Sequence, residues 1–134
     1  VATPRVVLDT NVLVAAGFRP DSASGRLVAA ARGGRLLALW TDATRAEAKR
    51  ILGQIPPLED YDLALLFPEA GRVAAPLALG PVSGADGVID QTLAALALSA
   101  GAPLVTADRL LAAAATAVGA TVLSPTEAER RLAS

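Results

Sequence analysis

The chain has 134 residues, the usual length of one domain, and we expect a single domain spanning 1–134. It contains neither Cys nor His, which excludes disulfides, thiolate metal sites and histidine bases. Any catalysis must therefore rest on carboxylates, hydroxyls, arginines or the one lysine, Lys49. A net charge of −1 argues against a simple basic nucleic-acid binder, although an acid cluster would lower the total of an otherwise basic surface.

Two further absences in the sequence bear on location. No apolar block approaches the roughly 18 unbroken residues of a membrane span. No basic segment followed by an apolar one is present, as a secretory signal would require. Together with the lack of Cys, this favours a cytoplasmic protein without membrane contact.

The N-terminal segment predicts a central strand that ends in polar residues. Residues 5–8, RVVL, form a β-branched apolar run of the length of a buried strand. Asp9, Thr10 and Asn11 follow at once, and an apolar helix start then occupies 12–16. Three polar side chains between apolar runs are costly unless they are paired. The alternative is a hydrogen-bonded turn in which Asp9 is a local cap.

The middle of the chain alternates helices and strands. Turn and cap residues predict a loop at 17–24. We then expect a helix at 25–31, a strand at 36–40, a helix at 43–52, a short helix at 58–67 and a short strand at 72–74. Glu47 lies one turn inside the second of these helices. It either pairs with Arg50 on an exposed face or faces the crevice of the sheet as a further acid. The acids Glu59, Asp60 and Asp62 indicate a solvated face.

The C-terminal part carries the most informative stretch, residues 86–111. Asp86 and Asp90 open an apolar helix that Gly101 ends, and 103–106 reads as a buried strand. Asp108 follows this strand, before a helix at 109–118, a strand at 121–123 and a capping box, Ser124 to Glu127, that starts a closing helix. Alternating strands and helices of this kind predict an α/β domain with a parallel sheet.

In such sheets, ligands bind beyond the carboxyl ends of the strands. Asp108 is delivered to that edge. Asp90 reaches it only if its helix is packed suitably. The alternative is that Asp90 and Asp108 each cap a helix.

These motifs carry a resemblance to a known family. VVLDTNVLV at 6–14 and DGVIDQTLAALALSAGAPLVTADRLL at 86–111 resemble the PIN-domain ribonucleases, closest to the small bacterial PIN proteins described as toxins of toxin–antitoxin pairs. The likeness covers nearly the whole chain. It implies a three-layer α/β/α domain with a mainly parallel central sheet of four to five strands.

The resemblance also implies a site. The family's acids are matched by Asp9, Glu47, Asp90 and Asp108, with Asp86 as the alternative to Asp90. Asp9, Asp90 and Asp108 would hold Mg²⁺ or Mn²⁺, ions that oxygen ligands suit. Glu47 would be a further ligand or a base. Thr10, Asn11 and Thr106 would orient carboxylates or waters. For phosphate contacts, we look to the cations nearest the acids in sequence, which are Arg19, Arg26, Arg45 and Arg109.

The implied function is a metal-dependent ribonuclease acting on RNA, with an antitoxin as partner and a homodimer as its assembly. The alternative is a PIN scaffold that no longer cuts and serves as an RNA-binding or protein-binding module. The proline-rich region 56–83 departs from the ordinary family helices. It would limit access to the site if it covered the crevice.

Overall fold

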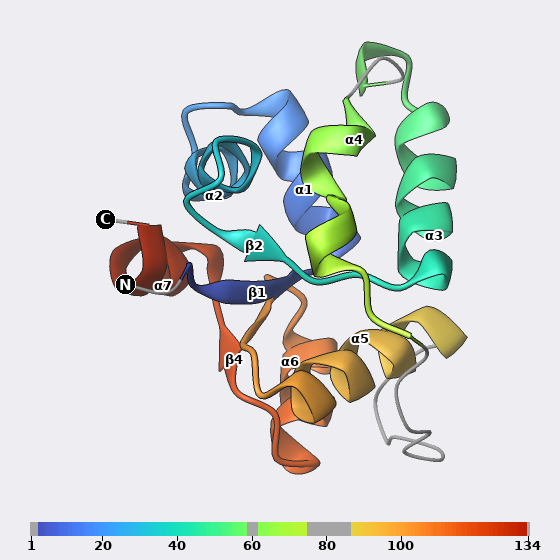
Figure 1. Cartoon of the computed structure of the whole chain (residues 1–134), viewed down its shortest axis with the longest axis vertical. Coiled ribbons are helices and arrows are strands. Elements are labelled where there is room, and N and C mark those ends of the chain that lie inside the picture. Colours follow the sequence, from blue (N-terminus) through green and yellow to red (C-terminus); the bar gives the residue numbers. More distant parts are fainter. Residues whose placement is uncertain (1–2, 59–61, 75–86, 134) are drawn as a thin grey trace.

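The computed structural model in Figure 1 describes residues 3–58, 62–74 and 87–133. Four short strands form one sheet in the order β2-β1-β3-β4, and all neighbouring strands run parallel. These are β1 (Arg5–Leu8), β2 (Leu37–Ala38), β3 (Leu104–Val105) and β4 (Val122–Leu123). The predicted parallel sheet is confirmed, and its four strands are the lower of the two expected numbers.

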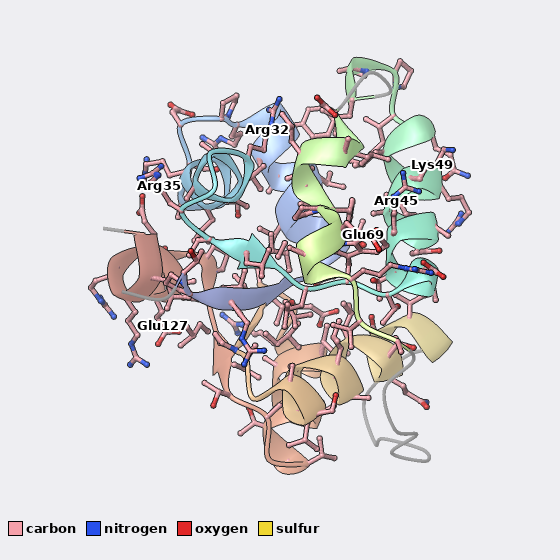
Figure 2. All side chains as sticks on the ribbon, viewed as in Figure 1. Arg32, Arg35, Arg45, Lys49, Glu69 and Glu127 are labelled. Atoms are coloured by element: carbon pink, nitrogen blue, oxygen red, sulfur yellow. The ribbon has the colours of Figure 1, made fainter. Side chains whose placement is uncertain are left out.

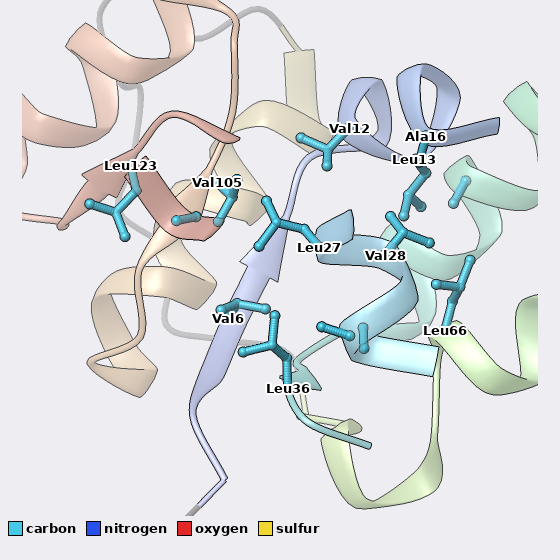
Figure 3. Packing of buried hydrophobic residues seen from close by; sticks show 14 residues of the cluster. Val6, Val12, Leu13, Ala16, Leu27, Val28, Leu36, Leu66, Val105 and Leu123 are labelled. Atoms are coloured by element: carbon cyan, nitrogen blue, oxygen red, sulfur yellow. The ribbon is translucent and has the colours of Figure 1, made fainter. Parts of the chain in front are cut away.

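Side chains alternate between the two faces of the sheet, as the pleat of a strand requires. Val6 is buried in a cluster with α1 (Thr10–Phe18) and α2 (Ala23–Arg32), shown in Figure 3. Val7 belongs to the opposite cluster, with α5 (Gly87–Ala100) and α6 (Arg109–Ala117). The sheet therefore lies between two helical layers, which confirms the predicted three-layer arrangement (Figure 1).

The second half of the first helical layer is added by α3 (Asp42–Gly53) and α4 (Leu63–Leu66). Short 3₁₀ turns lie at Pro56–Leu58 and Glu69–Gly71. The Trp40 and Phe67 rings pack edge to face, with centroids 5.9 Å apart, and the indole N–H of Trp40 donates to the Pro68 carbonyl over 2.7 Å. These contacts fix α4 against the end of β2.

The C-terminus closes as the capping box predicts. In α7 (Pro125–Ala128), the Ser124 hydroxyl accepts the Glu127 N–H, and the Glu127 carboxylate accepts the Ser124 N–H. A π-helical turn, Glu129–Ala133, follows. Arg26 on α2 pairs with Glu129, which ties this end of the chain to the first helical layer.

Several predicted boundaries were wrong. The expected loop at 17–24 is partly helical, because α1 runs to Phe18 and α2 begins at Ala23. Gly17 lies inside α1, where the lack of a Cβ leaves room for Leu58, since a Cβ there would stand 2.3 Å from Leu58 Cδ2. The helix expected at 58–67 is only the four residues of α4 within the described chain. The strand expected at 36–40 shortens to β2, since beyond it Trp40 bonds to the Gly71 and Val73 backbone.

The strand expected at 72–74 becomes a single parallel bridge between Trp40 and Arg72. The proline-rich predictions beyond residue 74, and Asp86, lie outside the described residues. In the parts of the chain that the structure describes, no helix is both long and apolar enough to cross a membrane.

Candidate active site

The strand order reverses between β1 and β3, and we use the word crevice for the sheet edge beyond the carboxyl ends of these two strands. From β1 the chain crosses to β2 on one side, whereas β3 pairs with β1 on the other side. In open parallel sheets, ligands bind at such a reversal, outside the carboxyl ends of the strands. Asp9 follows β1 directly, and Thr106 follows β3 directly. The topology therefore brings together two polar residues that are 97 positions apart in sequence.

Asp9 is buried at this point and held by three contacts. It is 6% exposed, and its Oδ2 accepts the Thr106 hydroxyl over 2.7 Å. Its other oxygen accepts the Asn11 N–H at 3.5 Å, so Asp9 also caps α1. Its own N–H donates to the Val105 carbonyl. Burial raises the pKa of the Asp9 carboxyl, only partly opposed by the Thr106 hydrogen bond, because a desolvated charge is unfavourable.

Asp108 stands on the other side of Thr106. Its N–H donates to the Thr106 hydroxyl oxygen over 3.0 Å, and its Oδ1 accepts the Leu110 and Leu111 N–H groups at the start of α6. The Asp108 charge is near enough to contribute to the raised pKa of Asp9. Asp9 and Asp108 each cap a helix, as one prediction from the sequence held. They also lie near each other at the carboxyl edge of the sheet, as the other prediction held.

A narrow pocket lies beside Asp9, at the ends of β1 and β2. Leu8 and Thr10 line it from the β1 side, and Thr44 and Ala48 line it from α3. Leu66 of α4 and Phe67, the residue that follows this helix, form a further wall. Part of the proline-rich region therefore does border the crevice, as a packed element with Leu66 in the core. Thr44 was not predicted to line a pocket, because in the sequence it stands only as a residue of the first turn of a helix.

The other two predicted acids come from different helices. Asp90 lies in the first turn of α5 and is half-buried. Both oxygens of Glu47 accept from Arg50, at 3.1 and 2.7 Å, and this ion pair lowers the pKa of Glu47. No group of three or more Asp or Glu side chains is arranged to hold a metal ion among residues 3–58, 62–74 and 87–133.

The oxygen set around Thr106 suits a hard divalent cation. Mg²⁺ keeps several waters and is commonly bound through one or two carboxylates plus substrate phosphates. The Asp9 carboxylate accepts the Thr106 hydroxyl, and Asp108, whose backbone N–H donates to the same hydroxyl oxygen, adds a second carboxylate close enough to affect the pKa of Asp9. The attraction of a cation would offset the desolvation and the repulsion that raise the pKa of Asp9. The residues present therefore fit such an ion.

The four predicted substrate cations have different surroundings. Arg26 is bound by Glu129 and by the Asp21 carbonyl, and Arg19 is exposed after α1. Arg45 is half-buried on α3, where Figure 2 labels it with Lys49. Arg109 is exposed in the first turn of α6, next to Asp108. Of the four, it is the one adjacent to an acid of the crevice.

Comparison with known proteins agrees with this arrangement. The family model of the PIN domain matches residues 5–110, which includes β1, β3, Asp9, Thr106 and Asp108. No curated protein and no solved structure matches the chain. The match covers more than half of the sequence and contains both sides of the crevice. The chain belongs to the PIN-domain family, whose members are commonly nucleases.

Proposed function

We propose that the protein is a Mg²⁺- or Mn²⁺-dependent ribonuclease that hydrolyses RNA phosphodiester bonds. One observation carries the proposal: the Thr106 hydroxyl joins Asp9 and Asp108 where the strand order reverses. Asp9 is a buried carboxylate that the Asp108 charge repels, which is unfavourable without a cation. Phosphoryl chemistry uses such a cation together with the substrate.

Each residue has a role in this proposal. Asp9 and Asp108 would hold the ion, together with Asp90 from α5. Such an ion, when bound, activates water and stabilises charge on the phosphate and the leaving oxygen. Thr106 fixes the orientation of the Asp9 carboxylate, since its hydroxyl donates to Oδ2. Glu47 would act as a further ligand or as the carboxylate that takes the proton of the attacking water, which requires it to leave Arg50.

Thr10 and Asn11 complete the site in this proposal. They would orient the carboxylate or water ligands from the first turn of α1. The Asn11 N–H already donates to Asp9, and Thr10 lines the pocket beside it.

Cleavage of a mixed-sequence RNA in millimolar Mn²⁺ tests the proposal. Asp9→Asn and Asp108→Asn keep the shape of the side chains and should each reduce the cleavage rate at least about a hundredfold, as expected when a group that binds the ion or positions it loses its charge. Asp21→Asn is the matched control, because Asp21 is an exposed acid away from the crevice. Unchanged cleavage in both site variants would overturn the assignment of these residues.

A second function is favoured by a separate observation. Glu47 is bound by Arg50, and within the described chain no three acids form a metal-holding group. A PIN scaffold that binds RNA or protein without cutting would need no such group. Retained RNA binding without cleavage in any divalent metal would select this alternative.

The biological setting of the proposal rests on resemblance. The motifs at 6–14 and 86–111 resemble those of bacterial PIN toxins, so we propose a cytoplasmic toxin with an antitoxin partner and a homodimeric assembly. Growth arrest on expression of the chain, relieved by Asp9→Asn, would support the toxin role. A sedimentation experiment measures the assembly.

A further inference from the structure

The outer face of α6 is apolar and exposed. Leu110 is 65% exposed, more than Phe18 or Leu65, the other two exposed large hydrophobic side chains of the described residues. Ala113 and Ala117 follow Leu110 one and two helical turns later and are also exposed, so the three side chains share one face of the helix. A contiguous apolar face rimmed by polar residues is typical of interaction sites.

A groove of about 810 Å³ lies beside this face, between α6 and α7. One wall is α6, which contributes Ala112 and Ala113, and the other wall is Val122 of β4 with Ser124 and Glu127 at the start of α7. Both helices contact β4. β4 is the last strand of the sheet and, among the described strands, pairs with β3 alone. The groove therefore follows a free sheet edge, the kind of edge at which another chain associates.

The two walls of the groove carry opposite charges. Arg109 lies on the α6 wall, next to Asp108, and Glu127 lies on the α7 wall. The hydrogen bonds of Glu127 with Ser124 lower the pKa of its carboxyl, which is therefore ionised at neutral pH. A two-fold axis along the groove would set the α6 wall of each copy against the α7 wall of the other. The charges of such a pair are complementary, because Arg109 then faces a carboxylate.

We propose that the outer face of α6 and this groove form the interface of a two-fold symmetric homodimer. Leu110 and Ala113 pack against the same apolar face of the second copy, and Arg109 pairs with the partner's Glu127 on each side. Thr106 and Asp108 line the inner end of the groove, so each acid crevice borders the interface and lies beside a guanidinium group of the other copy. The inference rests on the homodimer of the proposed function and does not depend on RNA cleavage.

Sedimentation equilibrium in EDTA tests the interface without RNA or cleavage. The wild type should form a dimer at micromolar concentration. Leu110→Glu places an unpaired charge in the apolar centre of the interface and should raise the dimer dissociation constant at least about tenfold. Phe18→Glu on α1 and Leu65→Glu on α4 are the matched controls, since they add the same charge at other exposed apolar side chains, and should leave the constant unchanged. If Leu110→Glu loses its thermal transition, Ala113→Glu replaces it on the same face.

A double-mutant cycle tests the charge pair. Arg109→Ala and Glu127→Gln should each weaken dimerisation about fivefold, because exposed ion pairs are weak and the symmetry repeats each one. Glu127→Gln keeps a side-chain oxygen that can accept the Ser124 N–H. The double variant should be no weaker than the single variants, since all three lack the same pair. Losses that multiply in the double variant would overturn the pairing of the two walls.

The outcomes separate the interface from the nuclease. A dimer broken by Leu110→Glu and kept by both controls supports the interface, and absence of RNA cleavage by that same wild type would overturn the nuclease alone. A dimer broken only by Phe18→Glu or Leu65→Glu overturns the interface and leaves a cleaving wild type as a nuclease. A wild type that stays monomeric overturns the second copy as the occupant and leaves a protein of another sequence as the alternative.

Discussion

The Thr106 hydroxyl donates to Asp9 Oδ2 over 2.7 Å, and this bond links the ends of β1 and β3 through side chains, in addition to the backbone bond from Asp9 to Val105. Thr106 is 3% exposed and Asp9 is 6% exposed, so water cannot readily replace either partner. The hydroxyl oxygen in turn accepts the Asp108 N–H. The orientation of the buried carboxylate and the start of α6 therefore depend on the same side chain.

Replacing Thr106 tests this bond. Thr106→Val keeps the shape but leaves Asp9 Oδ2 without its donor, which should cost about 1–3 kcal/mol of unfolding free energy. Thr106→Ser retains the hydroxyl and should lose clearly less. Urea unfolding at neutral pH measures both. Equal losses in the two variants would assign the effect to packing of the methyl group instead of to the hydrogen bond.

The stability of the metal-free protein should depend on pH through Asp9. Its folded-state pKa is raised above the ordinary value of 3.8, so the unfolded chain releases this proton first as the pH rises. The folded protein is therefore not destabilised by Asp9 below pH 3.8, and the destabilisation is complete once the pH exceeds the raised folded-state pKa. Asp9→Asn lacks the titration. We expect its stability relative to wild type to increase over that window and then level off.

Thermal unfolding across pH 3–8, roughly the range in which carboxylates titrate, checks this. Millimolar Mn²⁺ should raise the Tm of the wild type at neutral pH and have a much smaller effect on Asp9→Asn, because the neutral amide replaces one of the charged ligands of the proposed ion. A stability difference independent of pH would show that Asp9 titrates normally.

Variants of the Glu47–Arg50 pair distinguish two roles for Glu47, that of a surface ion-pair partner and that of an active-site acid held by Arg50. The pair is partly exposed, so Arg50→Ala should change the unfolding free energy by less than about 1 kcal/mol. If Glu47 is a metal ligand, Arg50→Ala should free its carboxylate and lower the Mn²⁺ concentration needed for half-maximal cleavage. Glu47→Gln should raise that concentration. Lys49→Ala, an exposed neighbour on α3, is the control. Wild-type metal dependence in Glu47→Gln would leave Glu47 with only its pairing role.

Gly71 is required by the close approach of its segment to β2. A Cβ at this position would lie 2.0 Å from the Ala38 carbonyl oxygen, a backbone atom that cannot turn aside. Gly71→Ala should therefore destabilise the protein by about 1–3 kcal/mol, as overpacking does. Gly53→Ala is the counterpart, since nothing lies within 4 Å of its Cβ position. It should be neutral or slightly stabilising, and similar Tm losses in the two variants would contradict the steric explanation.

Predictions from the sequence were correct for features that depend only on residues within one helix or strand. The RVVL run forms β1, and Ser124 with Glu127 forms the predicted capping box. Elements that depend on tertiary contacts were mispredicted. The strand expected at 72–74 is a single bridge to Trp40, and α1 continues through Gly17, which packs closely against Leu58. Neither partner is a neighbour in sequence.

The parallel α/β class, the lack of Cys and His, and the position of Asp9 and Asp108 at the ends of two strands could all be predicted from the amino-acid sequence. Each of these follows from composition or from periodicity within a few residues. The pairing of β1 with β3, the contact of Thr106 with both Asp9 and Asp108, and the choice of Arg50 as the partner of Glu47 became visible in the folded molecule. Those facts depend on strand order and helix packing, which bring together side chains from distant parts of the chain and are set by the burial of the whole core.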